Sequence, residues 1–421
     1  MSSPQTITQK ILSRVVGRPV TEGETIYPEP DLVTTHDLYV VNFDQALRGL
    51  GASKLHNPDK VLISTDHEPV AANKVAAERQ KSIREIVGRY GIKRFFDTGR
   101  GGHGHVFPME QGIVRPGMLV IAYDTHVTNY GAVGCLGFAV VTEISEVLAC
   151  GSVWIRVPET VRINLKGRLR RGTAMRDVAQ RLSADLDPDV VDYCVVEYGG
   201  PALADIGFGG RMTLCNTPLE IGAKSAIIEP DQAMIDWVSS RTKEPFTPVS
   251  SDPGAKYKLV IDYDMSKLEP QVAVPPRPDT VVNVSEVEGV EINHAFIGSC
   301  ANCSIEDMRD AASVLRGRTV HPRVRMFITP GTQEIASKAA QEGLLQVFIE
   351  AGVSITSPGC GPCAGGRVGT IALGEKSINT GTRNDPNRLG PGDAGIYLAS
   401  PFTVAASAVA GQITDPRAFL P

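Results

Sequence analysis

The chain has 421 residues, with 42 Lys and Arg against 47 Asp and Glu, and its formal net charge is −5. This length predicts two to four domains and excludes a peptide or a small disulfide-stapled module. Because the chain is acidic, it offers no general positive field to a phosphate backbone, so nucleic acid is not an expected partner.

No apolar stretch approaches the roughly 18–20 residues of a membrane span, and residues 1–18 lack the apolar centre of a signal peptide. We therefore expect a cytoplasmic protein without membrane contact. In that reducing compartment, the eight cysteines are expected to be thiols or metal ligands rather than a disulfide framework.

Short β-type runs alternate with helical patterns along the chain. The first alternation is a strand at 60–65, a helix at 70–91 and a strand at 118–124. A second set comprises strands at 294–300, 324–330 and 353–360 with helices at 305–317 and 332–343. Such alternation is typical of parallel sheets covered by helices, so the sequence predicts an α/β fold.

Two places in the sequence indicate domain boundaries. The Pro-rich stretch 240–282 has no sustained hydrophobic period, which predicts a connection ending near 283, and a softer boundary lies near Gly167. We therefore expect α/β domains over residues 1–166, 167–283 and 284–421.

The strongest local signal is the pair Cys360 and Cys363, in a Gly/Pro-rich loop that lets the backbone approach a bulky ligand. On its own the pair also suits a redox dithiol, half a zinc site or two incidental buried thiols. Cys300 sits between a predicted strand and a helix, where backbone N–H groups favour a thiolate. Three thiolates suit an iron–sulfur cluster with one iron open to substrate. Cys303 is either a fourth ligand or a packing thiol.

Acidic and basic side chains follow two predicted strands. Asp66 and His67 follow one strand, and Asp124, Thr125 and His126 follow another. The carboxyl ends of parallel strands face the ligand crevice, so these residues are candidate acid–base pairs, with helix capping as the alternative role.

Further histidines and arginines lie in turn-rich segments. His36, His103 and His105 stand in turn- or Gly-rich settings, and Arg383 and Arg388 lie five apart in a loop. The two arginines suit a carboxylate clamp, although two solvated surface arginines are the alternative.

Four segments together resemble the aconitase superfamily, specifically the large subunits of isopropylmalate isomerase-type dehydratases. The resemblance extends from Thr35 to Pro416. Its markers are IGSCAN at 297–302 with ED at 306–307, GCGPC at 359–363, GRMTLCN at 210–216 with EIGA at 220–223, and YLASP to ITDP at 397–416.

The resemblance implies three α/β/α-layered domains around a central cluster cleft. It also implies a [4Fe–4S] cluster with one open iron, held by Cys300, Cys360 and Cys363. The open iron would bind the hydroxyl and a carboxylate of a malate-type acid. The activity implied is that of a hydro-lyase, which removes and adds water reversibly.

Individual site roles also follow from the resemblance. Asp66 and His67 would protonate the leaving hydroxyl, while Asp124, Thr125 and His126 match the motif that holds the iron-bound water. His105 matches a substrate-side histidine, and His103 is a competing match because one extra residue sits between Arg100 and His105. The remaining matches are Asn216 and Glu220 to an Asn/Glu pair near the cluster, and Arg383 and Arg388 to the arginines that bind substrate carboxylates.

The chain departs from the family pattern at several positions. Thr125 replaces a serine, Ala301 a threonine and Thr382 an asparagine, and Tyr39 and Val41 are larger than the family's Thr and Pro. Because the last two lie near the family's substrate position, maleate, citraconate and dimethylmalate-type acids stay open as substrates beside 3-isopropylmalate.

The sequence contains no segment for the swivelling C-terminal domain of aconitase. We therefore expect a separate small subunit that supplies the base for the carbon-bound proton. Two alternatives are a cluster-free or zinc-bound relative and a non-enzymatic, cluster-sensing RNA-binding relative, and the acidic balance argues against the second.

Overall fold

The computed structural model describes residues 3–363, 368–392 and 394–420. The chain forms two compact units, each assembled from separate segments and described by itself. The first unit comprises Met1–Leu165, Asp189–Ala204 and Gly222–Tyr263, and the second comprises Lys166–Pro188, Asp205–Ile221 and Asp264–Pro421. The three domain ranges expected from the sequence stay a prediction.

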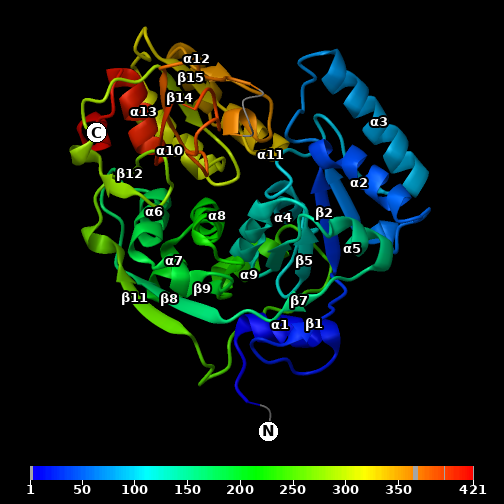
Figure 1. Ribbon diagram of the computed structural model, residues 1–421. Coiled ribbons are helices and arrows are strands. Elements are labelled where there is room, and N and C mark those ends of the chain that lie inside the picture. Colours follow the sequence, from blue (N-terminus) through cyan, green and yellow to red (C-terminus); the bar gives the residue numbers. More distant parts are fainter. Residues whose placement is uncertain (1–2, 364–367, 393, 421) are drawn as a thin grey trace. The chain divides into compact units, whose positions relative to one another are not determined.

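The first unit is organised by a five-stranded parallel sheet with the order β4-β3-β2-β5-β6. Two of its strands, β2 and β5, are labelled in Figure 1. Its strands are β2 (Leu32–His36), β3 (Val61–Ser64), β4 (Arg94–Phe96), β5 (Leu119–Ala122) and β6 (Leu136–Ala139). Every residue of β2, β3 and β5 is buried, as expected for a parallel sheet that is covered on both faces.

Helices complete the core of this unit. They are α1 (Ile7–Val16), α2 (Asp37–Gly49), α3 (Lys74–Tyr90), α4 (Phe107–Glu110), α5 (Ile144–Cys150) and α9 (Gln232–Ser239). Ile11, Phe43, Ile83 and Leu148 pack from α1, α2, α3 and α5 into one apolar core with the strands. The Asn73 side chain caps α3 by accepting the N–H of Ala76, which explains where this helix begins.

The strand order creates a topological switch point. The chain runs from β2 to β3 and β4 on one side, and then returns to place β5 on the other side of β2. In open α/β sheets, the loops at such a point diverge and leave a crevice beyond the carboxyl ends of the strands. The ends of β2 and β5 are therefore the expected place for a ligand.

The first unit also contains two smaller sheets. One is β10-β9-β8-β11, with β8 (Thr160–Lys166), β9 (Val195–Gly199), β10 (Ser225–Ile228) and β11 (Leu259–Asp264). The other is the antiparallel pair of β1 (Thr25–Ile26) and β7 (Ile155–Arg156).

The second unit is built on a seven-stranded sheet with the order β13-β12-β18-β17-β14-β15-β16. Strand β12 is antiparallel to both neighbours, and the strands from β18 to β16 are parallel. The strands are β12 (Gln271–Ala273), β13 (Val281–Asn283), β14 (His294–Ile297), β15 (Arg325–Ile328), β16 (Ser354–Ile355), β17 (Lys376–Asn379) and β18 (Gly395–Ala399).

This sheet also reverses its order, here between β14 and β17, so the loops after these two strands face a crevice of the same kind. The helices of the unit are α6 (Met175–Asp185), α8 (Phe208–Asn216), α10 (Ile305–Leu315), α11 (Gln333–Gln341), α12 (Leu344–Glu350) and α13 (Pro401–Ala410). The short helix α7 (Pro188–Val191) spans the chain boundary between the two units.

The α/β class expected from the sequence is confirmed. Across the described ranges, no helix combines the length and the apolarity that crossing a bilayer requires.

The partly buried Asp310 of α10 gives the second unit a pH-dependent stability. Burial, and then the negative charges of Asp307 and Glu306, raise the pKa of Asp310 from 3.8 to about 8. Because the folded-state pKa is the higher one, stability is complete below about pH 4 and is lost as the pH rises through 8. Asp310→Asn should therefore raise the unfolding free energy at pH 8 by about 1–2 kcal/mol and leave it unchanged at pH 4.

Thermal melting of both proteins at the two pH values checks this expectation. Asp59→Asn is the matched control, because the Asp59 side chain is 63% exposed. A lower melting temperature for Asp310→Asn at pH 8 would contradict the electrostatic explanation.

Candidate active site

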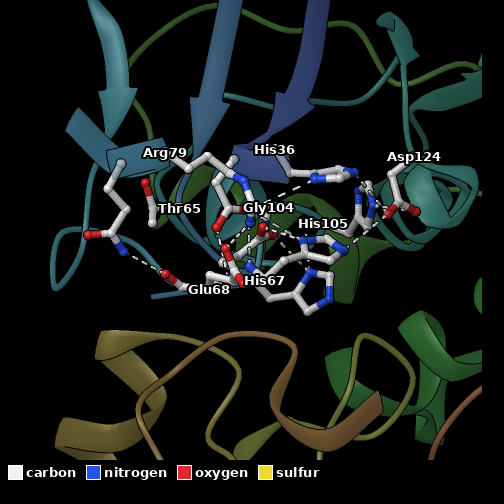
Figure 2. Close-up of polar contacts among 12 residues, drawn as sticks. His36, Thr65, His67, Glu68, Arg79, Gly104, His105 and Asp124 are labelled. Carbon is white, nitrogen blue, oxygen red and sulfur yellow. Dashed lines mark hydrogen bonds and ion pairs between the residues drawn. The ribbon is translucent and has the colours of Figure 1, made fainter. Parts of the chain in front are cut away.

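Polar side chains of the first unit gather at the carboxyl ends of the parallel strands (Figure 2). His36 is the last residue of β2, Asp66 and His67 follow β3, and Asp124 follows β5. His105 lies in the loop after β4. The sheet thus brings together residues that are nearly 90 positions apart in the sequence.

Asp66 and His67 form a hydrogen-bonded pair. The His67 Nδ1 lies 2.8 Å from Asp66 Oδ1, and Asp66 Oδ2 accepts the backbone N–H of Gly104 at 2.7 Å. Burial disfavours ionisation of Asp66, but the charge and hydrogen bond of His67 outweigh it and hold the Asp66 pKa below its usual value. A Cβ at Gly104 would lie 2.4 Å from Ser64 Oγ, so only glycine allows this approach. The ionised Asp66 therefore orients the imidazole through Nδ1.

The Asp124 carboxylate lies among four histidines. Its Oδ1 is 3.1 Å from His105 Nε2 and 3.5 Å from His126 Nδ1. Its Oδ2 is 3.7 Å from His36 Nε2 and 3.6 Å from His67 Nε2. Burial opposes ionisation of Asp124, but the charge and hydrogen bond of His105, followed by His126, hold its pKa well below the usual value. A fixed negative charge therefore lies beside the Nε2 edge of His67.

Thr125 stands at the start of the 3₁₀ segment Thr125–Val133, directly after Asp124. Asp124 caps this segment, because its Oδ1 accepts the N–H of His126 at 2.9 Å. The helix-capping role considered from the sequence is therefore real for Asp124, and it coexists with the contacts to the imidazoles.

His36 and Asp37 were not assigned a role from the sequence, yet both contact His67. The His36 ring stacks on the His67 ring at 4.0 Å between centroids, and burial lowers the pKa of His36 to about 3, so it is neutral at pH 7. Asp37 accepts the N–H groups of His67 and Glu68 at 3.2 and 2.8 Å. Burial, and then the charge of Asp66, raise the Asp37 pKa to about 6. The signal that could have found them is their position at the end of β2.

The two competing histidines of the 103–105 loop take different partners. His105 contacts Asp124, whereas His103 Nδ1 lies 3.8 Å from Asp66 Oδ2 and accepts the N–H of His105 at 3.2 Å. His103 is 1% exposed, and burial lowers its pKa to about 3.

A small cation is a further occupant that this cluster could hold. The ligand atoms of His36, Asp37, Asp66 and His67 all lie within 4.8 Å of one another. The short Asp66–His67 hydrogen bond instead favours an acid–base pair.

The predicted cluster cysteines lie in loops at the strand ends of the second unit. Cys300 follows β14 and is 4% exposed, and Cys360 and Cys363 follow β16 and are each 6% exposed. Asn216 Nδ2 donates to Cys300 Sγ at 3.2 Å, and Arg388 Nη2 donates to Cys363 Sγ at 3.7 Å. The end of the motif, residues 364–366, lies outside the described residues.

The backbone that carries Cys300 is held in an uncommon conformation. Ser299 has a φ of +71°, which few residues other than glycine adopt, and its hydroxyl donates to the carbonyl of Thr380 at 3.1 Å. Thr380 Oγ1 also accepts the N–H of Gly298 and donates to its carbonyl, both at 2.9 Å. The loops after β14 and β17 are thus tied together, which fixes where the Cys300 sulfur points.

The loop that carries Cys360 and Cys363 is also tightly packed. Gly361 has a φ of +59°, and a Cβ there would lie 2.3 Å from Thr329 Oγ1. Cys303 is fully buried and packs against Gly331, where a Cβ would lie 2.4 Å from its sulfur. The packing role considered for Cys303 is consistent with this position.

The remaining candidates of the second unit are two arginines and one glutamate, and one of the arginines is ion-paired with the glutamate. Arg383 Nε donates to Glu220 Oε2 at 2.6 Å, and the Glu220 side chain is only 6% exposed. Arg388 has intermediate exposure, and the negative charge of Cys363 raises its pKa above the usual value. These arginines therefore differ from the solvated surface arginines considered as the alternative.

A comparison with known protein families finds one family that matches most of the chain. The family described as "Aconitase family (aconitate hydratase)" matches residues 9–289 and 285–411. This chain belongs to the aconitase family. It is therefore a hydro-lyase enzyme, and both the resemblance and the enzyme class expected from the sequence are confirmed.

Aconitase-family relatives match this chain along almost their whole length. The 3-isopropylmalate dehydratase large subunit 1 of Methanopyrus kandleri is 39% identical, covering 99% of this chain and 100% of the relative. The homoaconitase large subunit of Thermus thermophilus is 42% identical, covering 98% of this chain and 97% of the relative. Among solved structures, aconitase X of Thermococcus kodakaraensis has a TM-score of 0.48 and 12% identity, with coverage of 90% of this chain and 89% of that chain.

The aconitase family implies a [4Fe–4S] cluster, and the residues of the second unit fit one. Three largely buried thiols are available, and two of them accept hydrogen bonds, one of these from a guanidinium. Such donors stabilise thiolates, the form that binds iron.

Proposed function

We propose that this chain is the large, cluster-binding subunit of a dehydratase that acts on malate-type hydroxy acids, with 3-isopropylmalate as the favoured substrate. The Asp66–His67 pair beside Asp124 carries this proposal, because it offers an oriented proton donor at the strand ends. Relatives named as 3-isopropylmalate dehydratase large subunits, matched over nearly their full length, support the substrate.

In this proposal, Cys300, Cys360 and Cys363 hold the cluster, which supplies a Lewis-acidic iron when bound. Asn216 and Arg388 stabilise two of the thiolates through the hydrogen bonds described above. The third candidate ligand, Cys360, lies in the glycine-rich loop beside them.

His67 delivers a proton from Nε2 to the leaving hydroxyl, and Asp66 holds its Nδ1. Asp124 keeps the imidazole edges of His67 and His105 in place, and the N–H of His126 donates to Asp124 and orders the segment that bears it. Reversal of these roles serves the addition of water, as microscopic reversibility requires.

The carboxylates of the substrate need cationic partners. Arg383 and Arg388 fill this role in the proposal, since each guanidinium has several donors that match a carboxylate. Glu220 holds Arg383 through Nε, which leaves the other nitrogens of the guanidinium for substrate.

We also propose a separate small subunit as partner, since the relatives are named as large subunits. That subunit would supply the base for the carbon-bound proton. A homoaconitate-type tricarboxylic acid is the second candidate substrate, because a relative named homoaconitase is 42% identical.

Substrate profiling of the anaerobically reconstituted pair of subunits tests the proposal. The panel contains 3-isopropylmalate, homoaconitate, maleate, citraconate and 2,3-dimethylmalate. We expect kcat/KM for 3-isopropylmalate to exceed the others by about tenfold or more, the discrimination that apolar contacts typically provide. A clear preference for homoaconitate would select the second candidate. Absence of turnover with every acid by a pair that carries its cluster would contradict the proposed function.

A further inference from the structure

Arg176 is a buried charge in the second unit that the proposed function does not use. It lies in α6 and is only 2% exposed, among the largest buried side chains of the chain. Its Nη2 donates to the carbonyl oxygen of Gly381 at 2.6 Å, whereas its Nε has no hydrogen-bond partner among the described residues. In the same described ranges, no carboxylate lies within ion-pair distance of this guanidinium.

The guanidinium remains charged despite its burial. Burial lowers the pKa of Arg176 to about 10, and the charges of Glu220, Cys363 and Cys300 act against this shift. At neutral pH the residue therefore keeps a positive charge inside the unit. A buried charge without a partner is strongly destabilising, so its retention indicates an anion that it serves.

The anionic groups near Arg176 include cysteines of the candidate cluster site. Glu220, the first of them, is already paired with Arg383 at 2.6 Å. Gly381, which accepts the Arg176 hydrogen bond, lies against Cys363, because a Cβ placed on Gly381 would be 3.6 Å from the Cys363 sulfur. The Cys363 thiolate, which also accepts a hydrogen bond from Arg388, therefore lies beside the residue that holds this guanidinium.

We propose that Arg176 is a positioning residue that supplies a fixed positive charge beside the thiolate of Cys363, and thereby retains the cluster that the three cysteines hold. This inference rests on the proposed function, since it requires that these cysteines bind a cluster. It differs from a purely structural role, in which Arg176 only fastens the Gly381 loop through a hydrogen bond.

The test compares wild type with Arg176→Met, Arg176→Lys and the control Arg168→Gln. Methionine removes the charge and roughly keeps the volume, lysine keeps the charge, and the Arg168 side chain is 85% exposed in the same unit. Each protein is reconstituted anaerobically with iron and sulfide. The rate of iron release to a ferrous chelator is then measured, and the melting temperature is recorded before reconstitution.

Arg176→Met should release iron about 10- to 100-fold faster than wild type, the usual effect of losing a partner of a metal ligand. Arg176→Lys and Arg168→Gln should stay within about twofold of wild type. Before reconstitution, Arg176→Met should melt no lower than wild type, because it lacks the uncompensated buried charge.

Two outcomes would overturn the inference. Wild-type iron release by Arg176→Met would show that the charge is not needed. A lower melting temperature of cluster-free Arg176→Met, or its failure to fold, would assign Arg176 the structural role at Gly381. Wild-type protein that takes up no iron and sulfide would instead overturn the proposed function on which the inference rests.

Discussion

Replacing Cys360 by serine should abolish cluster binding and bring hydratase turnover to background. A serine hydroxyl is a much poorer iron ligand than a thiolate. A Cβ at the neighbouring Gly361 would lie 2.3 Å from Thr329 Oγ1, so this loop is closely packed. Iron and acid-labile sulfide per chain, measured after anaerobic reconstitution, check the expected loss.

Two cysteine variants serve as controls for this loss. Cys150 is exposed, so Cys150→Ser should keep full iron. Cys303 is buried against Gly331, so Cys303→Ser should also keep its iron. Full iron in Cys360→Ser combined with loss in Cys303→Ser would show that the ligand assignment is wrong.

Replacing His67 by asparagine should lower kcat by about 10²- to 10⁴-fold while the cluster content stays unchanged. His67 is held by Asp66 on Nδ1 and faces Asp124 with Nε2, and asparagine cannot transfer a proton in its place. The loss should fall on kcat more than on KM, because general-acid assistance acts in the transition state. Steady-state kinetics of the two-subunit enzyme measure both constants.

His56→Asn is the matched control, since the His56 side chain is 42% exposed and lies near the other end of β3. Its kcat should equal that of wild type. Asp66→Asn should reproduce most of the His67 effect, because it releases the imidazole from its orientation. A near-wild-type kcat in His67→Asn would show that His67 is not the proton donor and has only a capping or packing role.

Strand ends could be predicted from the sequence because short apolar runs followed by Gly, Asp or Cys are a local signal. The expected strands 60–65 and 118–124 correspond to β3 and β5, and Asp66 and Asp124 follow them as predicted. The expected helix at 70–91 begins later, at Lys74, because Asn73 caps it. The pattern fixes which elements exist, while the capping residue decides where they start.

Other features depend on tertiary structure and leave no local signal. Helix α12 (Leu344–Glu350) lies beyond the helix expected at 332–343, and Gly343, with a φ of +72°, starts it two residues after α11 ends. Arg176 stands in a helix with Asp177, Arg181 and Asp185, a composition typical of a solvent-facing helix. Its burial follows only from the packing of the second unit.

The chain alternates between the two units. This alternation limits which fragments can fold alone and how early the first unit can fold during synthesis. The chain passes between the units at residues 165/166, 188/189, 204/205, 221/222 and 263/264. Along the chain, a segment of the second unit therefore lies between strand β8 and its partner β9. Another segment of the second unit lies between β9 and β10. A fragment that ends at residue 165 would leave β8 with unpaired edges, which favours aggregation. During synthesis, the first unit cannot complete this sheet before residue 263 has emerged, so its folding must wait for sequence that the ribosome delivers late.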